Sequence, residues 1–358
     1  MPTVIPQRIS LVEQTAKLIR EHIMNGVWQD VMPGEVELAE KFKISRVTLR
    51  AALEELKSEG WFSGTQGKRR FITRHLVRES ARPPASSVVL LSPVSLHHMP
   101  ASRVVRLLAL KEHLGAVGYD LDIQCNQACY SQHPERALEA LAARLRPAGW
   151  LLYLSTAPMQ RWFCERHLDC VISGSCHPNI DLPSVDIDYA ATCRHAVAKF
   201  VAKGHKRIAL VMPFSDQAGN LESERGFMEG GAQCQHQGVE VLIVHHAGTV
   251  EALCRVVDGL ISGQRPVTGL LVAKPAHAVT TVCHLLRRGI RIPETVGVIA
   301  RDDDPALEPV VPAISRYHID PALFARKVAR IVVQMLHHNA RQRKTHRLLP
   351  ELLSGETL

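Results

Sequence analysis

The first sixty residues carry apolar side chains at the three- and four-residue spacing of amphipathic helices. This pattern over positions 12–23 predicts a helix that ends at Gly26. A short helix is predicted over residues 34–42, and Ser45 can cap a third helix that runs to Gly60. The third helix offers these apolar residues for its buried face: Val47, Leu49, Ala52, Leu53 and Leu56. Two helices joined by a tight turn form a helix-turn-helix.

A basic hairpin is predicted after the third helix. Residues 61–72 read as two short strands around a Gly-containing turn, and a basic run at positions 68–70 belongs to that turn. A basic hairpin that follows a helix-turn-helix is a wing. Residues 75–86 then lose apolar periodicity and contain a pair of prolines, which indicates a linker.

Short apolar runs alternate with helical patterns from residue 88 to residue 300. Strands are predicted over 88–91, 119–123, 150–154, 170–173, 207–212, 239–244, 269–273 and 296–300. Helices are predicted over 102–117, 134–145, 158–167, 189–203, 222–236, 249–262 and 277–288. This alternation indicates an α/β fold with parallel sheets, in which ligands bind at the carboxyl ends of the strands.

The composition is typical of a globular protein of two or three domains. The chain has 358 residues, of which 46% are hydrophobic and 22% charged, and this excludes disordered and fibrous classes. Its apolar runs are too short to span a bilayer, and its first residues lack a signal core, so we expect a cytoplasmic protein. Nine cysteines without a C-x-x-C pair, Cys125, Cys164, Cys170 and Cys283 among them, predict reduced core thiols and no metal site.

The positive charge of the chain is concentrated in the predicted helix-turn-helix and wing. The formal net charge is +8, and residues 41–78 hold ten basic residues against three acidic ones. Residues 1–40 hold three basic residues against six acidic ones. A local excess of this kind favours a polyanionic partner such as DNA.

The same region resembles the winged helix-turn-helix of GntR-type bacterial transcription regulators. The runs at 32–39, 44–56, 59–62 and 67–69 carry the resemblance, which covers residues 8–76. Val36 departs from it, because several family members have an Arg there for DNA contact. A solvated charged helix and a basic surface hairpin remain the alternative interpretation.

A recognition helix reads base edges from its N-terminal residues, while basic side chains around it neutralise phosphates. Arg46 or Arg50 is expected to grip a guanine, and Ser45 and Thr48 to contact phosphate oxygens. At the wing, the expected minor-groove and phosphate contacts are Gln66, Gly67, Lys68, Arg69 and Arg70.

The second region is similar to the effector domain of LacI/GalR regulators, which share the two-lobed fold of periplasmic sugar-binding proteins. The matching runs are 182–189, 204–211, 225–227, 289–303 and 312–320. A GntR-type DNA-binding domain joined to such an effector domain is typical of arabinose-responsive regulators. This resemblance implies two lobes of parallel α/β sheet with an effector between them.

The resemblance implies three effector-binding positions, and only one of them keeps the residue usual in the family. Asp302 is retained, Ser223 replaces an Arg with Arg225 two residues further on, and Lys274 replaces an Asn. Lys274 at the end of a strand favours an anionic effector such as an acidic or phosphorylated sugar. Equally, Lys274 can pair with Asp302 or Asp303 and have only a structural role.

We therefore expect a DNA-binding transcription regulator, acting as a repressor, whose homodimer recognises a palindromic operator and senses a small carbohydrate. The predicted boundaries are 1–76 for the DNA-binding domain, 77–86 for the linker and 87–358 for the effector domain. No catalytic residue, cofactor or membrane partner is expected. A sugar-sensing binding protein without a DNA role would leave the basic residues of 41–70 unexplained. A GntR-headed aminotransferase-like enzyme would need a Schiff-base lysine in a much longer C-terminal region.

Overall fold

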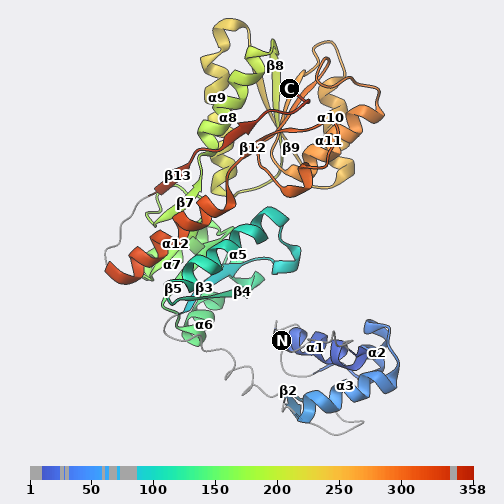
Figure 1. Ribbon diagram of the computed structural model, residues 1–358, viewed down its shortest axis with the longest axis vertical. Helices are drawn as coiled ribbons and strands as arrows, with labels where there is room; N and C mark the ends of the chain where they lie inside the picture. Colours follow the sequence, from blue (N-terminus) through green and yellow to red (C-terminus); the bar gives the residue numbers. More distant parts are fainter. Residues whose placement is uncertain are drawn as a thin grey trace, which may run out of the picture. The chain divides into compact units, whose positions relative to one another are not determined.

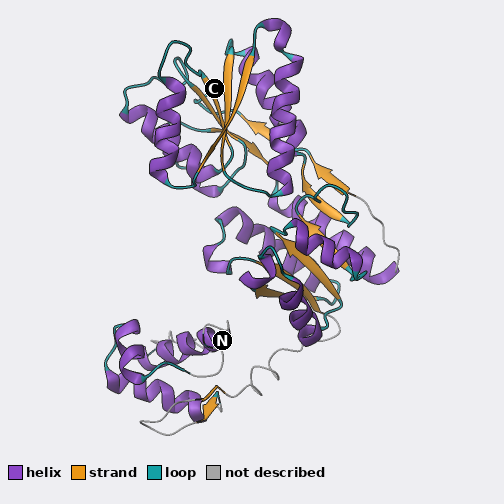
Figure 2. Cartoon of the chain, turned by 180° about the vertical axis from the view of Figure 1, so that it is seen from behind, coloured by secondary structure: helices purple, strands orange, loops and turns teal. Residues whose placement is uncertain are grey.

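The computed structural model describes residues 10–24, 28, 32–58, 61–63, 71–72, 87–338 and 345–358. Two units are distinguished by their internal packing. The first comprises Met1–Pro84 with Ala140–Arg146, and the second comprises Ala85–Glu139 with Pro147–Leu358. Figures 1 and 2 show the elements of both units.

Among the described residues of Met1–Pro84, the first unit contains three helices and a small antiparallel hairpin. These are α1 (Leu11–Met24), α2 (Glu35–Phe42), α3 (Arg46–Ser58), β1 (Phe62–Ser63) and β2 (Phe71–Ile72). Ile19, Leu38 and Leu49 are fully buried and join the three helices in one core. The helical spacing of the apolar residues therefore predicted these helices correctly.

The second unit begins with a lobe built on a parallel sheet of six strands in the order β13-β7-β6-β5-β3-β4. Its strands are β3 (Ser87–Ser92), β4 (Asp120–Cys125), β5 (Gly149–Tyr153), β6 (Cys170–Ser173), β7 (Ser184–Ile187) and β13 (Thr345–Leu348). Its helices are α5 (Ala101–Gly115), α6 (Glu135–Leu145), α7 (Ala157–Glu165) and α12 (Pro321–His338). We call this part the first lobe.

The second lobe contains a sheet in the order β14-β12-β11-β10-β8-β9, which is parallel except for β14. Its strands are β8 (Arg207–Pro213), β9 (Glu240–His246), β10 (Gly269–Val272), β11 (Gly297–Ala300), β12 (Ser315–His318) and β14 (Glu351–Leu353). Its helices are α8 (Tyr189–Ala202), α9 (Ala218–Gln233), α10 (Val250–Ile261) and α11 (Pro275–Arg287). The described residues of the unit also include four short 3-10 helices: Leu96–His98, Gln127–Tyr130, Gln235–Gln237 and Pro305–Leu307.

The sheet of the second lobe is covered by helices on both faces, and successive side chains of its central strands pack alternately against one layer and the other. Ile208 and Leu210 of β8 pack in one cluster with Phe200 of α8 and Phe227 of α9. Ala209 and Val211 pack in the other cluster, with α10 and α11. Because successive strand side chains point to opposite faces, a strand buried on both sides reads as a continuous apolar run.

The chain crosses between the lobes three times. It leaves the first sheet after β7, returns through α12 and β13, and ends in the second lobe with β14. Helix α12 lies alongside α5 in Figure 1, and Phe324, Val328 and Val332 share the core of the first lobe with Leu110 and Leu114 of α5. The sequence predicted no element beyond residue 300, so β12, α12, β13 and β14 were not foreseen, and β7 was not predicted either.

Two further predictions concern the cysteines and membrane-spanning helices. All nine cysteines are free, but Cys125 and Cys283 are exposed, so the prediction of core thiols is wrong for these two. Their apolar neighbours in sequence alternate with polar ones and do not bury the thiols. Within the described part of the chain, no helix combines the length and the apolar character needed to cross a membrane.

Candidate functional site: a nucleic-acid interface and a ligand cavity

The N-terminal end of α3 is fixed by Ser45, as its sequence position predicted. The Ser45 Oγ accepts a hydrogen bond from the main-chain N–H of Thr48 at 3.1 Å and lies 2.8 Å from the Thr48 Oγ1. A side-chain oxygen of this kind satisfies an otherwise unpaired N–H of the first helical turn. Ser45 and Thr48 thus hold each other at the start of the helix.

The exposed side chains of this first turn form one surface with Arg50, which follows a turn later. Arg46 and Arg50 are exposed, and the Arg50 Nε donates to Glu35 Oε2 of α2 at 2.9 Å. This pair leaves the terminal amino groups of Arg50 as donors for a partner. Val47 is 78% exposed, so its expected place on the buried face is wrong. Leu49, Ala52, Leu53 and Leu56 fill that face alone.

The wing contacts expected from the sequence lie outside the described residues. These are Gln66, Gly67, Lys68, Arg69 and Arg70. Strands β1 and β2, which flank them, pair antiparallel as the sequence predicted, with Phe62 opposite Ile72 and Ser63 opposite Phe71.

A cavity of about 670 Å³ lies between the two lobes of the second unit. Tyr153 and Ser173 line it from the ends of β5 and β6 in the first lobe, and Pro213 and Ala273 from the ends of β8 and β10 in the second. The carboxyl ends of parallel strands are where open α/β sheets bind ligands. Its volume is that of a site for a small molecule.

Arg301 organises the wall that the second lobe contributes to this cavity. Its Nε and Nη2 each lie 3.0 Å from an oxygen of Asp302, and its Nη1 lies 2.9 Å from both Asn220 Oδ1 and Ser223 Oγ. The guanidinium also sits 4.5 Å from the centre of the Tyr189 ring. Burial opposes the charged form, but the Asp302 carboxylate beside it outweighs this and raises the pKa of Arg301. Arg301 is therefore a cation held in place by four hydrogen bonds.

The two following acidic residues are also engaged by neighbours. Asp303 accepts from Arg316 at 2.7 Å and lies 2.5 Å from His318 Nδ1. Asp304 accepts main-chain N–H bonds from Ser102 at 3.0 Å and from Ala306 at 3.1 Å. Burial alone would raise the pKa of Asp304, but these N–H donors outweigh burial and lower it. The triple Asp is therefore held by specific partners.

The four effector-binding residues expected from the sequence lie in different surroundings. Asp302 and Lys274 line the cavity, whereas Ser223 is fully buried beneath Arg301. Arg225 does not line the cavity, since its side chain is 64% exposed and lies 3.8 Å from Glu229. Lys274 is exposed and, among the described residues, forms no ion pair with Asp302 or Asp303, whose partners are those given above.

Sequence analysis missed two arginines of α5 that line the cavity, Arg103 and Arg106. They are three residues apart, which places them on one face of the helix. Helical spacing in the run Ser102–Arg106 could have indicated a basic stripe, but not that the stripe faces a cavity. Which way α5 turns is decided by its packing against α12, a contact between residues far apart in sequence.

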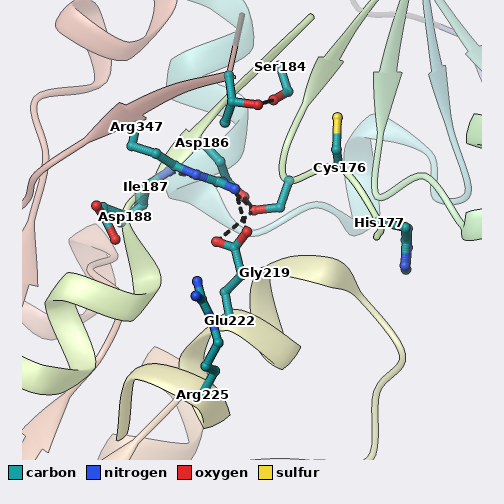
Figure 3. A network of polar contacts seen from close by, with 12 residues as sticks. Cys176, His177, Ser184, Asp186, Ile187, Asp188, Gly219, Glu222, Arg225 and Arg347 are labelled. Carbon is teal, nitrogen blue, oxygen red and sulfur yellow. Dashed lines mark hydrogen bonds and ion pairs between the residues drawn. The ribbon is translucent and has the colours of Figure 1, made fainter. Parts of the chain in front are cut away.

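A second polar network joins the lobes at one side of the cavity (Figure 3). Arg347 of β13 pairs with Glu222 of α9, and its Nη1 donates to Ser175 Oγ at 2.6 Å. Ser175 donates in turn to the buried Asp186 at 2.8 Å. Burial raises the pKa of both Glu222 and Asp186, although Arg347 opposes the shift. This network connects the sheet of the first lobe to a helix of the second.

Comparison with known proteins finds a matching family for the N-terminal helix-turn-helix and another for the C-terminal part of the two-lobed unit. Residues 11–72 match the family described as bacterial regulatory proteins of the gntR family, and residues 197–358 match a periplasmic binding protein-like domain. The chain joins a GntR-type DNA-binding domain to a LacI-type, periplasmic-binding-protein-like domain. The GntR and LacI resemblances of the sequence are thereby confirmed, and so is the α/β fold class.

Similar proteins from bacteria are transcriptional regulators. The arabinose metabolism transcriptional repressor of Geobacillus stearothermophilus is 24% identical over 286 residues, which is 76% of each chain. The regulator CelR of Thermobifida fusca is 24% identical over 44% of this chain, and the match spans about half (47%) of its own length. The fatty acid metabolism regulator protein of Haemophilus influenzae is 37% identical over 62 residues, 16% of this chain and 26% of its own.

Solved structures show the same fold. A complex of CelR with cellobiose has a TM-score of 0.66 at 19% identity and covers 98% of this chain and 100% of its own. A LacI-family regulatory protein from Chloroflexus aggregans has a TM-score of 0.66 at 20% identity and covers 76% and 98%. At such identities the likeness concerns the fold, and the ligand in the first structure is a property of CelR.

Proposed function

We propose that this GntR/LacI-type chain is a sequence-specific DNA-binding transcriptional repressor that responds to a small carbohydrate-like effector. The observation that carries the proposal is the exposed surface of Arg46, Val47 and Arg50 at the start of α3. It belongs to a domain of a DNA-binding family, within a chain that also holds a ligand-sized cavity. The regulators similar to this chain support the same function.

The proposed domain boundaries remain 1–76, 77–86 and 87–358, and the proposed location is the cytoplasm, where the DNA is. The mechanism that fits two lobes around one cavity is a population shift. An effector that prefers one arrangement of the lobes shifts the protein toward it by its difference in affinity. Contacts between the lobes that such a shift can change include the Arg347–Glu222 pair and the bond from the Ser102 N–H to Asp304.

An enzymatic function has less support from the residues around the cavity. Asp302, Asp303 and Asp304 are each held by the partners described above. None of them is left as a free base or nucleophile, which carboxylate catalysis needs. The family relatives are regulators as well.

Substitutions on α3 test the DNA-reading surface. Arg46→Ala or Arg50→Ala is expected to weaken binding to the preferred sequence by about 1–3 kcal/mol, because a bidentate bond to guanine is lost. Lys57→Ala is the matched control, since Lys57 is an exposed basic residue in the last turn of the same helix. Gel-shift titrations on specific and random duplexes measure the effect. Equal binding by both Arg variants and the parent would refute this assignment.

Val47 adds a contact that the sequence analysis did not foresee. An exposed apolar side chain between Arg46 and Thr48 fits the 5-methyl group of thymine in the major groove. Val47→Ala is expected to reduce the preference for T over C at one base position and to leave the other positions unchanged. Binding to duplexes with uracil in place of thymine checks this, since removal of the methyl group should weaken the parent but not the variant.

A homodimer is proposed because a two-fold operator requires two DNA-binding domains. On α5, Val105 and Leu108 are 43% and 59% exposed and lie three residues apart, so they share a face that a second copy can cover. Leu108→Asp is expected to shift a dimer toward monomer in sedimentation, whereas Val250→Asp on the exposed side of α10 is not. A parent protein that sediments only as a monomer, with or without DNA, would contradict the proposal.

A further inference from the structure

Two arginines face the cavity from α5 without partners that account for their charge. The Arg106 side chain is 9% exposed, and its Nε and Nη1 form no hydrogen bond. Its guanidinium lies 4.7 Å from the centre of the Phe324 ring. Burial, together with the charge of Arg103, lowers the pKa of Arg106 to about 10, so it stays protonated at neutral pH. A buried cation of this kind is costly unless an anion or an acceptor meets it.

Arg103 lies one turn earlier and is half-buried. Within the described part of the chain, no carboxylate comes within ion-pair distance of it. Its interactions with Tyr189, Tyr153, Asp302 and Asp186 are electrostatic ones at longer range. Arg103 therefore keeps its five donors for another group.

The carboxylates around the cavity do not neutralise these arginines directly. Asp302 is held by Arg301, Asp303 by Arg316 and His318, and Asp304 by two main-chain N–H groups. Asp186, the remaining one, accepts from Ser175 and from the N–H of Ile187 at 2.8 Å each. Lys274 adds a further uncommitted cation to the lining. Arg103, Arg106 and Lys274 thus offer positive charge to the cavity, and the acids around it are already engaged by other partners.

The rest of the lining is suited to hydroxyl groups. Gln217 and Asn220 at the start of α9 present amides, and Ser155 and Ser173 present hydroxyls. Tyr153 and Tyr189 contribute aromatic surface. Convergent polar groups on a partly aromatic wall are typical of sites for small polar ligands.

We propose that the cavity binds a hydroxyl-bearing small molecule with one carboxylate or phosphate, and that Arg103 and Arg106 hold this acidic group. Sugar acids and sugar phosphates have this chemistry. Two arginines on one helix face can form parallel charge-assisted bonds to such a group, with the polyol part directed toward Asp302 and Asn220. The proposal rests on the proposed function in taking this cavity as the effector site.

Calorimetric titration of the full-length protein tests the proposal with matched neutral and acidic probes. The probes are glucose with glucuronate, gluconate and glucose 6-phosphate, and galactose with galacturonate. At least one acidic probe is expected to bind more tightly than its neutral counterpart, and the set shows whether carboxylate or phosphate is preferred. Arg103→Gln and Arg106→Gln should each weaken that binding about tenfold or more, since each loses a charge-assisted bond.

Arg225→Gln is the matched control, because Arg225 is an exposed arginine of α9 that does not line the cavity. It should leave the affinity for the acidic probe unchanged. Arg103→Lys, which keeps the charge and loses the planar fork, should retain part of the affinity. Binding of a neutral sugar that both Gln variants leave unchanged would overturn the proposal, and so would failure of every acidic probe to bind.

Failure of the proposed function gives a different result. Each Gln variant should bind the preferred DNA as the parent does without added probe, and its melting temperature shows whether it is folded. If the parent binds no DNA sequence preferentially but an acidic probe binds through Arg103, only the regulatory role fails.

Discussion

Gly226→Ala is expected to destabilise the second lobe by about 3 kcal/mol or more, the largest effect of any single methyl group considered in this protein. A Cβ at Gly226 would come within 3.0 Å of the main chain of Ala190, so the substitution forces α8 and α9 apart. These two helices lie side by side in Figure 1, and Phe227, the next residue, is fully buried between them and the sheet. Backbone cannot yield as the end of a side chain can.

Thermal unfolding measures this effect, and a loss of this size should lower the melting temperature by roughly 6–12 °C. Gly259→Ala provides the control, because nothing lies within 4 Å of a Cβ at this position in α10. Ala is the better helix former, so the control should gain about 0.5–1 kcal/mol. Equal melting temperatures for the two variants would show that α8 and α9 do not approach as closely as described.

Arg301→Met is expected to lower the free energy of unfolding by about 3 kcal/mol and to abolish effector binding. The substitution leaves the Asp302 carboxylate without its bidentate partner and withdraws a hydrogen bond from each of Asn220 and Ser223. Breaking a buried pair is more costly than losing an exposed one, because the remaining charge stays desolvated. Urea unfolding of the variant measures the free energy, and titration with the panel of sugars measures binding.

An exposed ion pair in the same lobe gives the contrast. Arg194 and Glu229 are joined at 2.5 Å, with side chains 33% and 39% exposed, so Arg194→Met should cost less than about 1 kcal/mol. Asp302→Asn in the Arg301→Met background should recover part of the lost stability, since it removes the unpaired charge. Similar losses for Arg301→Met and Arg194→Met would show that Arg301 does not organise this wall.

Local patterns predicted most of the elements but little of the cavity. The helical spacing around Ile19 and Leu53 and the apolar run at 208–212 each fix one element, because burial of a face shows directly in the sequence. Val47 has the same hydrophobicity as its buried neighbours, and only the packing of α3 on α1 and α2 decides that it is exposed.

The cavity residues were harder to predict for the same reason. Arg103 and Arg301 come from different lobes and lie almost two hundred positions apart in the sequence. Only the folded chain brings both of them to the lining of one cavity. The resemblance predicted Asp302 and Lys274 as cavity residues but could not show that Arg301 bonds the Ser223 hydroxyl. Arg225 was expected beside them, but it lies two positions after the buried Ser223 on α9, and its side chain is exposed to solvent.

Selection of DNA from a random duplex library by the full-length protein tests the central claim most directly. The account predicts enrichment of an inverted repeat by the parent and loss of that enrichment in Arg46→Ala, with Lys57→Ala behaving as the parent. Acidic sugars that bind the cavity should then alter the affinity for the selected duplex in the parent but not in Arg103→Gln. A library that emerges from selection by the parent without any enriched sequence would contradict the account.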